Sequence, residues 1–455
     1  EVGSSIRTQN GAMLRAGNNL KIRQGELETE EGKTVLAAGR DVSISEGRQI
    51  TELDASFHSK SKGLLSRSQT LSRTRLGHDE TVGSSIGGGT IAVTAGRDVN
   101  VRGSSIISDD GTAIQAGRDI SLSAARNRYA GSEYRESKKS GLMGAGGLGF
   151  TLGSRKTADD AEHTDLTHTG STAGSLKGGT AVTAGRRYRQ TGSTVSSPEG
   201  NNTITAQSID IEAANNRYAA GYVHNREQKG LTAAINVPVV QAAQNLVQTA
   251  QTVGQSKNGR VNAMAAANTA WQGHQAARSI LQAAGGQNTG ISLSLAYGRQ
   301  KSRSGQTNRR TEAEAGQIIG KGQTTLTASG GGERSNINIT GSDIVGNAAT
   351  ALIADNRITL RSAEQHGSGQ DENKSSGWNA GATVRPGSGL GITAGGNAGK
   401  GGGQGQSTAH RHTHVGSTAG QTTIRSGGDT TLKGAQLIGK GIGLDAQSLR
   451  IRSVQ

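Results

Sequence analysis

AGRDVNV at residues 95–101 and AGRDISL at residues 116–122 are two copies of one phrase that begin 21 residues apart. A third copy, AGRDVSI, lies at residues 38–44, and a decayed copy, AGRRYRQ, begins at Ala184. After the Arg-Asp pair, apolar residues alternate with small polar ones, which is the period of a β-strand with one buried face. A unit of about 20 residues cannot bury that face alone. The repeat therefore predicts an all-β fold in which short strands stack, coil on coil, into a parallel β-solenoid.

The composition fits a narrow stacked core. Glycine accounts for 71 of the 455 residues, whereas Phe, Trp and Tyr number only 2, 2 and 6. Ordinary proteins contain roughly 7% glycine, and a conventional enzyme core would hold many more aromatic rings. We therefore expect a lumen filled by Val, Ile, Leu and Ala, with glycine at corners that need a positive φ. The absence of Cys excludes disulfides, thiol nucleophiles and Cys-based zinc sites.

Charge and hydropathy narrow the classes of partner. Lys and Arg total 50 against 35 Asp and Glu, a formal net charge of +15, which favours anionic partners. No run of about 18 or more apolar residues is present, so the sequence predicts no membrane-spanning helix. The phrase VGSSI at residues 2–6 recurs at residues 82–86, so we expect the chain to be a slice of a longer repeat protein.

A second, longer period interrupts the coils. Two related phrases that depart from the alternation are AARNRYAGSEYRESKKSGLMG, from Ala124, and AANNRYAAGYVHNREQKGLTA, from Ala213. Gly-rich stretches and polar return phrases such as HTHVGSTAG, which ends at Gly420, follow phrases of this kind. We interpret them as arms that leave and rejoin a single solenoid of residues 1–455. The predicted arms cover residues 46–82, 126–169, 215–320 and 362–415.

The third arm carries an insertion with a different period. Val239, Ala243 and Leu246 fall at helical spacing, and SKNG at residues 256–259 interrupts the pattern. The sequence therefore predicts a helical hairpin over residues 238–287. We expect its apolar stripe to dock on the solenoid or on the third arm, with binding to a membrane or a partner as the alternative.

Four phrases resemble the hemagglutinin repeat of large two-partner-secretion exoproteins, the family of filamentous hemagglutinins and contact-dependent growth inhibition toxins. They are AGRDISLSAARNRY (116–129), ESKKSGLMGAGGLGFTLGS (136–154), THTGSTAG (167–174) and GGDTTLKGAQLIG (427–439). The resemblance covers nearly the whole chain and departs most in the third arm, which lacks an intact HTGST return. It implies a right-handed parallel β-helix, export through a dedicated outer-membrane secretion partner, and display on the bacterial cell surface.

The resemblance also sets the functional alternatives. In the adhesins of the family this region is a rod and a binding surface, and in the toxins it is associated with delivery across the target cell's outer membrane. We expect a segment of a secreted adhesin or toxin carrier, a rod for cell-surface binding and effector presentation. A membrane-active device that helps translocate a C-terminal toxin is the alternative. A polysaccharide-active β-helix enzyme is a third, but no cluster of charged residues on one solenoid face supports it.

Alternating stretches in the arms are candidates for membrane contact. Their apolar residues alternate with small or polar ones, as they do in membrane-spanning β-strands. At rest we expect the arms to lay these apolar side chains on the solenoid, and a rearrangement at a membrane is compatible with that resting state. The apolar candidates are Leu148, Phe150, Leu152, Ile291, Leu293, Leu295 and Trp378.

Basic residues also concentrate in the arms. A solvated hairpin face explains them, and attraction to an anionic glycan, to lipopolysaccharide or to another target-cell receptor is the functional alternative. Nucleic acid is not expected as a partner, because no aromatic stacking platform interleaves with the charges. The candidates for binding an anionic surface are Lys60, Lys62, Arg67, Arg73, Arg75, Lys138, Lys139, Arg155, Lys156, Arg299, Lys301, Arg303, Arg309 and Arg310.

No pattern of residues predicts catalysis or a cofactor. His410, His412 and His414 would share one face of a strand, but neighbours on that face are about 6.6 Å apart, which is long for one tetrahedral zinc. They are therefore weak metal candidates, and a feature of the arm's return strand is the simpler interpretation. The glycines at 144, 146 and 149 form G-x-G-x-x-G without a βαβ unit around them. We expect no enzyme and no cofactor.

Overall fold

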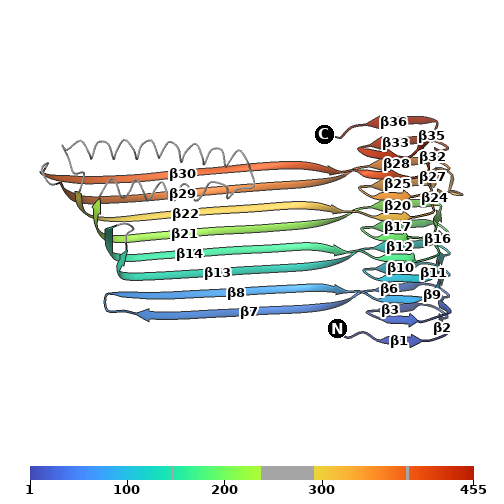
Figure 1. The fold of residues 1–455 in the computed structure, drawn as a ribbon, viewed down its shortest axis with the longest axis horizontal. Coiled ribbons are helices and arrows are strands. Elements are labelled where there is room, and N and C mark those ends of the chain that lie inside the picture. The colour runs from blue at the N-terminus through green and yellow to red at the C-terminus, as the bar shows by residue number, and fades with distance from the viewer. Residues whose placement is uncertain (145–147, 237–291, 386–388, 455) are drawn as a thin grey trace.

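The computed structural model describes residues 1–144, 148–236, 292–385 and 389–454. These residues form a parallel β-helix from which a long antiparallel sheet projects to one side (Figure 1). Strands stack in three parallel columns, and each coil contributes one strand or half-strand to each column. The parallel β-solenoid predicted from the 21-residue repeat is confirmed.

The three columns contain the following strands. The first is β1 (Ser5–Thr8), β4 (Glu26–Thr29), β9 (Ser85–Ala95), β11 (Ser105–Ala116), β15 (Thr172–Ser175), β18 (Thr194–Ser197), β23 (Gln317–Gly320), β26 (Asp343–Gly346), β31 (Thr413–Gly416) and β34 (Ala435–Ile438). The second is β2 (Gly11–Ala16), β5 (Lys33–Ala38), the second halves of β9 and β11, β16 (Gly179–Ala184), β19 (Asn202–Ala206), β24 (Gln323–Ala328), β27 (Ala349–Ala354), β32 (Gln421–Ser426) and β35 (Gly441–Asp445). The third is β3 (Leu20–Arg23), β6 (Val42–Ser45), β10 (Val99–Arg102), β12 (Asp119–Ser123), β17 (Arg187–Thr191), β20 (Ser208–Glu212), β25 (Asn336–Thr340), β28 (Arg357–Arg361), β33 (Asp429–Lys433) and β36 (Ser448–Arg452). A 3-10 helix, Gly332–Arg334, precedes β25.

The lumen is mostly aliphatic, as the alternation predicted. In β12, Ile120 and Leu122 are buried, while Ser121 between them and Ser123 after them point the other way and are half-buried. The expectation of a lumen filled by Val, Ile, Leu and Ala fails most clearly where the decayed phrase AGRRYRQ buries Tyr188 and Gln190 completely. Their polar groups satisfy each other: the Tyr188 hydroxyl donates to Oε1 of Gln190 at 2.7 Å, and Nε2 of Gln190 donates to the carbonyl oxygen of Ser193 at 2.5 Å. A buried polar group is tolerated when it is hydrogen-bonded in this way.

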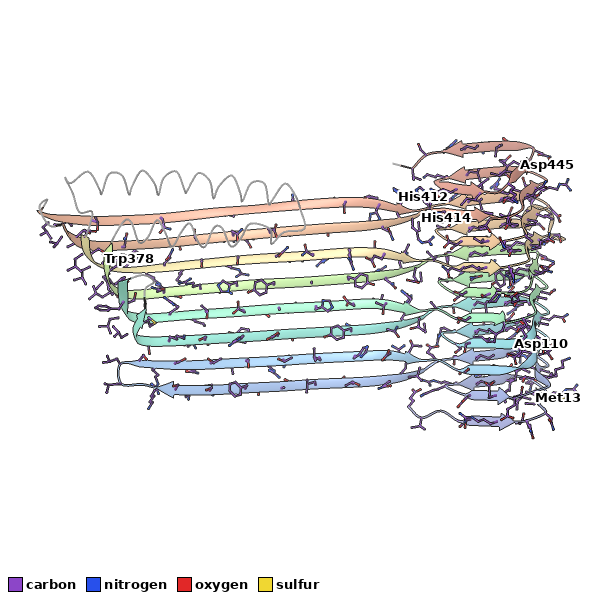
Figure 2. The ribbon with its side chains drawn as sticks, viewed as in Figure 1. Met13, Asp110, Trp378, His412, His414 and Asp445 are labelled. Atoms are coloured by element: carbon purple, nitrogen blue, oxygen red, sulfur yellow. The ribbon has the colours of Figure 1, made fainter. Side chains whose placement is uncertain are left out.

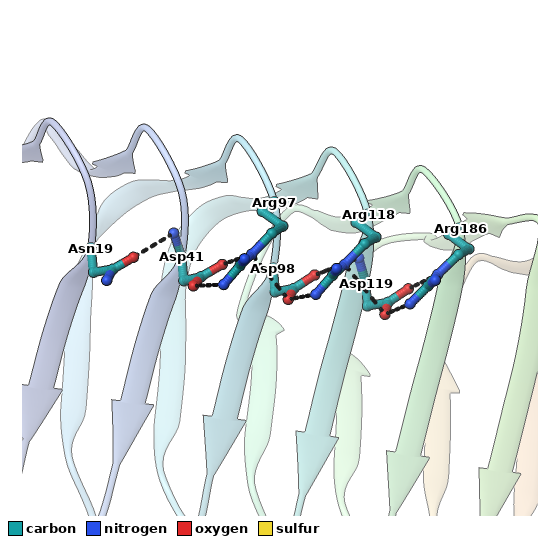
Figure 3. Close-up of polar contacts among 7 residues, drawn as sticks. All are labelled: Asn19, Asp41, Arg97, Asp98, Arg118, Asp119 and Arg186. Carbon is teal, nitrogen blue, oxygen red and sulfur yellow. Dashed lines mark hydrogen bonds and ion pairs between the residues drawn. The ribbon is translucent and has the colours of Figure 1, made fainter.

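The Arg-Asp pair of the repeated phrase forms a ladder along one corner of the solenoid (Figure 3). Each guanidinium forms a bidentate hydrogen bond with the aspartate carboxylate of the preceding coil. The pairs are Arg97 with Asp41, Arg118 with Asp98 and Arg186 with Asp119, each with an Nε–Oδ1 distance of 2.8 Å. These arginine side chains are 39% to 54% exposed, so each pair adds little to stability. The ladder's contribution is to favour one register between successive coils.

Four hairpins leave the solenoid, one after every second coil. The arms are β7 (Gly47–Lys62) with β8 (Ser66–Val82), β13 (Ala125–Gly144) with β14 (Leu148–Thr169), β21 (Ala214–Asn236) with β22 (Ser292–Glu314), and β29 (Ala363–Arg385) with β30 (Gly389–Arg411). Each arm leaves after a strand of the third column and returns into a strand of the first column.

Coil spacing explains why the arms join into one sheet. Neighbouring strands lie about 4.8 Å apart both along the solenoid and within a sheet. An arm of two strands that leaves every second coil therefore fills the distance to the next arm, so its return strand pairs with the next outgoing strand. The result is one eight-stranded antiparallel sheet in the order β7-β8-β13-β14-β21-β22-β29-β30, which we call the arm sheet.

Three expectations about the arms need comment. The prediction that they lie on the solenoid is wrong: they project from it, because pairing edge to edge satisfies their backbone groups (Figure 1). Two predicted arm boundaries ran too far, since residues 317–320 and 413–416 form solenoid strands. The helical hairpin predicted for residues 238–287 lies outside the described residues. Within the described ranges, no helix is long and apolar enough to cross a membrane.

Candidate functional site

The end of the arm sheet farthest from the solenoid carries apolar side chains on one face. Residues directly opposite each other in paired strands share a face. One such row runs from Leu142 through Leu152, Leu231 and Tyr297 to Ala380. Side chains two and four residues farther out on each strand point the same way. We call this set the distal apolar face; its large side chains are Leu142, Phe150, Leu152, Leu231, Leu293, Leu295, Tyr297, Val384, Leu390 and Ile392.

These side chains are open to solvent. Their exposed fractions run from 38% for Leu142 and Leu231 to 85% for Ile392. Trp378 lies one row closer to the solenoid, near the far end of the arm sheet (Figure 2), and is 51% exposed. Its ring centroid is 5.8 Å from that of Tyr297. Soluble proteins rarely leave a contiguous apolar surface of this kind uncovered unless it binds something.

The structure brings most of the predicted apolar candidates together. Phe150, Leu152, Leu293 and Leu295 lie on the distal apolar face, and Trp378 lies at its border. Leu148 is the first residue of β14, and Ile291 lies outside the described residues. Sequence analysis missed Leu142, Leu231, Leu390 and Ile392. Each is an apolar residue in a short Gly-rich or polar context, and only the alignment of one arm with the next by strand register reveals its place.

A belt of positive charge lies on the same face, next to the apolar end. Within the three rows closer to the solenoid, every described basic residue on this face belongs to what we call the basic belt. It consists of Lys60, Lys62, Arg67, Lys138, Lys156, Lys229, Arg299, Lys301, Arg303, Lys374 and Lys400. Eight of these were predicted, and Lys229, Lys374 and Lys400 were missed: Lys374 and Lys400 have no other Lys or Arg within ten residues, and the stretch with Arg226 and Lys229 was not recognised as a basic cluster.

Two carboxylates partly neutralise the belt. Glu136 lies 2.7 Å from Nζ of Lys138 and 2.9 Å from Nζ of Lys156, and these hydrogen bonds lower the pKa of Glu136 to about 2. A hydrogen bond from Arg299 at 2.5 Å lowers the pKa of Glu227 below its usual value. Both carboxylates therefore stay charged at neutral pH, yet basic side chains outnumber them in these rows, and the belt keeps a positive potential.

A shallow cavity of about 690 Å³ opens over the middle of the belt. Six of its lining residues are basic, five of them from the belt (Lys156, Lys301, Arg303, Lys374 and Lys400) and the sixth Arg226, whose position in β21 belongs to the opposite face; Asp160 and Glu227 also line it. Such a convergence of ammonium and guanidinium groups suits an anionic group such as a phosphate.

The remaining predicted basic residues lie elsewhere. Arg73, Arg75 and Arg309 are on the same face but nearer the solenoid, while Lys139, Arg155 and Arg310 are on the opposite face. Asp54 accepts hydrogen bonds from Arg73 at 2.6 Å and Arg75 at 3.3 Å, so these two are already paired. The structure thus divides the predicted basic residues between the two faces of the arm sheet. Basic residues on the opposite face can serve as controls in tests of the belt.

Comparison with known proteins bears on the family. The family described as Hemagglutinin repeat matches residues 65–186 and 297–455. The chain belongs to the hemagglutinin-repeat family. It is 33% identical over 429 residues to a tRNA nuclease CdiA of Escherichia coli strain STEC_O31, covering 91% of this chain and 13% of that protein. It is 32% identical over 378 residues to a deoxyribonuclease CdiA of Yersinia pseudotuberculosis, covering 81% of this chain and 34% of that protein. No solved structure matches.

This hemagglutinin-repeat segment spans a small share of those relatives. A toxin CdiA of Yersinia pestis, 32% identical over 382 residues, is covered to 11% of its length. The resemblance drawn from the repeated phrases is confirmed, including its two-partner-secretion and contact-dependent growth inhibition character. Proteins of this kind are secreted and displayed on the bacterial cell surface.

The three histidines of the hemagglutinin-repeat segment do not share a strand. His410 is the last residue but one of β30. His412 lies between β30 and β31, and His414 is in the solenoid strand β31 (Figure 2). Nδ1 of His412 is 2.9 Å from the carbonyl oxygen of Gly434, and Nδ1 of His414 is 2.8 Å from Oδ1 of Asp343. The predicted common strand face is therefore wrong. In the described part of the chain, no three His, Cys, Asp or Glu side chains are placed to hold a metal.

Asp343 fixes the point where the fourth arm rejoins the solenoid. Arg411 donates to both of its carboxylate oxygens, at 2.8 and 3.3 Å, and His414 contacts it from the next strand. Burial raises the pKa of Asp343, but the hydrogen bonds from Arg411 and His414 outweigh burial, so the pKa lies below its usual value.

We expect Asp343→Ala to lower the free energy of unfolding by about 2 kcal/mol at pH 7, since it removes hydrogen bonds to a charged acceptor. A lowered folded-state pKa gives stability that is present above about pH 3.9 and is lost as pH falls through the folded-state value. Urea unfolding at several pH values should thus show the difference from wild type shrinking below pH about 4. Asp445→Ala is the control, because that carboxylate is 73% exposed and pairs with Arg425. A gap that does not shrink at all as the pH falls below about 4 would contradict the assignment.

Proposed function

We propose that this segment is a β-helical rod that carries the arm sheet to the surface of a target cell, where one face of the sheet binds an anionic membrane. The observation that carries the proposal is the placement of the basic belt beside the distal apolar face. Both lie on a sheet that projects from the rod (Figure 1). The segment acts by binding and by presenting what it is attached to, not by catalysis. In the full-length protein, a secretion partner in the producing cell would export the rod.

The two surfaces have complementary physical roles. Each basic side chain near an anionic membrane surface contributes about 1 kcal/mol of attraction, which falls with ionic strength. Apolar side chains then add salt-independent binding, at roughly 25 cal/mol per Å² of apolar surface removed from water. Binding should therefore have a salt-sensitive part from the belt and a salt-resistant part from the distal apolar face.

Charge reversal in the belt tests the proposal. We expect the triple variant Arg67→Glu, Lys229→Glu, Arg303→Glu to bind vesicles of anionic phospholipid about 100-fold more weakly than the parent, because three attractions of about 1 kcal/mol are lost. Co-sedimentation at about 0.05 and about 0.3 M salt measures this, and the parent's binding should weaken at the higher salt.

The opposite face of the arm sheet provides a matched control. Lys139→Glu, Arg155→Glu, Arg226→Glu changes the net charge by the same amount, and its three residues lie on the face away from the belt. We expect it to stay within about threefold of the parent, since its reversed charges do not contact the membrane. Equal losses in both triple variants, or binding that ignores salt and lipid charge, would rule out the belt as the binding surface.

A second function, assistance in moving a toxin domain across the target outer membrane, is favoured by the names of the relatives, which are nucleases and toxins. Membrane contact by the arm sheet would be its first step. Protection of arm peptides from protease on outer-membrane vesicles, beyond the distal apolar face and into the belt, would support this function, whereas full cleavage of the belt would oppose it.

A further inference from the structure

A row of glycines crosses the arm sheet between the basic belt and the distal apolar face. Gly141, Gly153, Gly230 and Gly298 lie directly opposite one another in β13, β14, β21 and β22. The row continues through β29 to Gly395 in β30. We call this row the glycine crease. A line of glycines across a sheet is a known way to bend it.

The crease needs glycine for steric reasons. A Cβ at Gly153 would lie 2.1 Å from the carbonyl oxygen of Lys229, and one at Gly298 would lie 2.5 Å from that of Trp378. Gly141 has φ +102° and Gly230 has φ +151°, which L side chains rarely adopt. Figure 1 shows the distal ends of β13, β14 and β21 turning out of the line that their strands follow from the solenoid. The sheet therefore consists of a straight inner part and a bent end.

The bent end is too short to span a membrane. Its apolar alternation covers Leu293–Tyr297 in β22 and Ala380–Val384 in β29, about 17 Å of strand at 3.4 Å per residue. A transmembrane strand needs about 9 to 11 residues to cross a hydrocarbon core of about 30 Å. The next rows toward the solenoid carry the basic belt, which cannot face lipid chains.

The two faces of the bent end also differ. On the face away from the apolar side chains, Thr151 and Thr232 pair through their hydroxyls at 3.0 Å, and Ala296 lies opposite Thr232. Met143, 8% exposed, lies opposite Thr151 on this face. The face therefore presents no exposed row of large apolar side chains, and the other side of the bent end suits hydrocarbon better.

We propose that the part of the arm sheet beyond the glycine crease is a flap that lies in a single leaflet of anionic phospholipid, with the crease as its hinge. The inference rests on the proposed membrane binding and specifies its geometry. The distal apolar face enters the upper acyl region, the Tyr297–Trp378 pair sits at the interface, where such rings prefer to lie, and the basic belt stays above it against the phosphates. The bend at the crease sets the angle between the inner part of the arm sheet and its distal part. With this angle, the distal part can lie flat on the membrane while the sheet projects from the rod.

The depth of Trp378 tests the flap. The chain contains two tryptophans, so Trp271→Phe leaves Trp378 as the single reporter. The full chain is bound to phosphatidylglycerol-containing vesicles that carry bromine either near the headgroup or near the chain end. We expect the headgroup-proximal bromine to quench Trp378 at least threefold more than the terminal one. Stronger quenching by the terminal bromine would overturn the single-leaflet placement.

The hinge is tested by filling the crease. In the same single-tryptophan background, Gly153→Val with Gly298→Val places side chains where backbone atoms already lie, while Gly401→Val with Gly403→Val is the control, because no atom lies within 4 Å of either added Cβ. We expect both variants to sediment with vesicles within about threefold of the parent at low salt, through the belt. Quenching of Trp378 should fall by at least half in the crease variant alone.

The outcomes separate the two proposals. Failure of the parent to bind vesicles would overturn the proposed function. Binding with deep quenching would overturn only the single-leaflet flap. A crease variant that keeps shallow, undiminished quenching would overturn the hinge. The depth measurement on the intact crease stands even if the crease variant misfolds, which circular dichroism of the free protein would detect.

Discussion

Gly117→Val is expected to lower the free energy of unfolding of the solenoid by about 3 kcal/mol or more, at the upper end of the overpacking range. A Cβ at this position would lie 2.3 Å from the carbonyl oxygen of Gly96 in the preceding coil. Overpacking costs least when a flexible side chain can move aside. Here the colliding atom belongs to a backbone held by stacked hydrogen bonds, including the one from the N–H of Gly117 to the carbonyl oxygen of Ala95 at 3.0 Å.

The same collision recurs along the corner. A Cβ at Gly39, Gly96 or Gly185 would lie 2.0 to 2.2 Å from the carbonyl oxygen of the corresponding glycine one coil earlier. The glycine of the repeated phrase is therefore needed for the close approach of successive coils, which the sequence analysis attributed to corner φ angles instead.

Gly17 is the matched control, because it occupies the same corner in the first coil and no atom lies within 4 Å of an added Cβ. Gly17→Val should change the free energy of unfolding by less than about 0.5 kcal/mol, as surface substitutions usually do. Urea unfolding followed by far-ultraviolet circular dichroism compares the two. Equal destabilisation by both variants would show that valine's own backbone preference, and not the coil-to-coil contact, is responsible.

Features that depend on local sequence could be predicted, whereas contacts between different coils could not. Alternation around Ile120 and Leu122 predicts a strand with one buried face, because that pattern is local. The pairing of Arg118 with Asp98 joins residues of different coils, so it emerges only when the coils are stacked. The arm sheet is even harder to predict from local sequence patterns. It forms because the height of two coils equals the width of a two-stranded arm.

The candidate site shows the same division. Phe150 and Leu295 were identified as apolar arm residues, but they were predicted to pack on the solenoid. The sequence does not show which strand edges of the arms will pair with one another. The predicted set of basic residues also included residues such as Lys139, which has the same charge but lies on the opposite face of the arm sheet. Register, which decides the face, is set by the hairpin turns and by the coil spacing together.

Tyr188→Ala is expected to cost about 3 to 5 kcal/mol of stability, the range for deleting a large buried aromatic ring. Tyr188 is fully buried in a lumen whose other large side chains are aliphatic. Burial also raises the pKa of its phenol far above the usual value, so the hydroxyl stays protonated and remains a donor to Gln190. Urea unfolding at neutral pH measures the loss.

Tyr188→Phe separates ring volume from hydrogen bonding. It keeps the ring but leaves the buried Oε1 of Gln190 without its donor, which should cost about 1 to 3 kcal/mol. Tyr222→Phe is the surface control: Tyr222 is 45% exposed and its hydroxyl donates to Asp159, so its loss should stay within about 0.5 kcal/mol.

If Tyr188→Phe cost as much as Tyr188→Ala, the polar network would be the main contributor at this coil. A smaller cost for phenylalanine would mean that this coil admits an aromatic residue because its lumen is wide enough, with Gln190 there to satisfy the hydroxyl. Since Gln190 also donates to the carbonyl oxygen of Gln317 at 3.0 Å, just after the third arm, the network ties that arm's return to a coil that lies before the arm leaves.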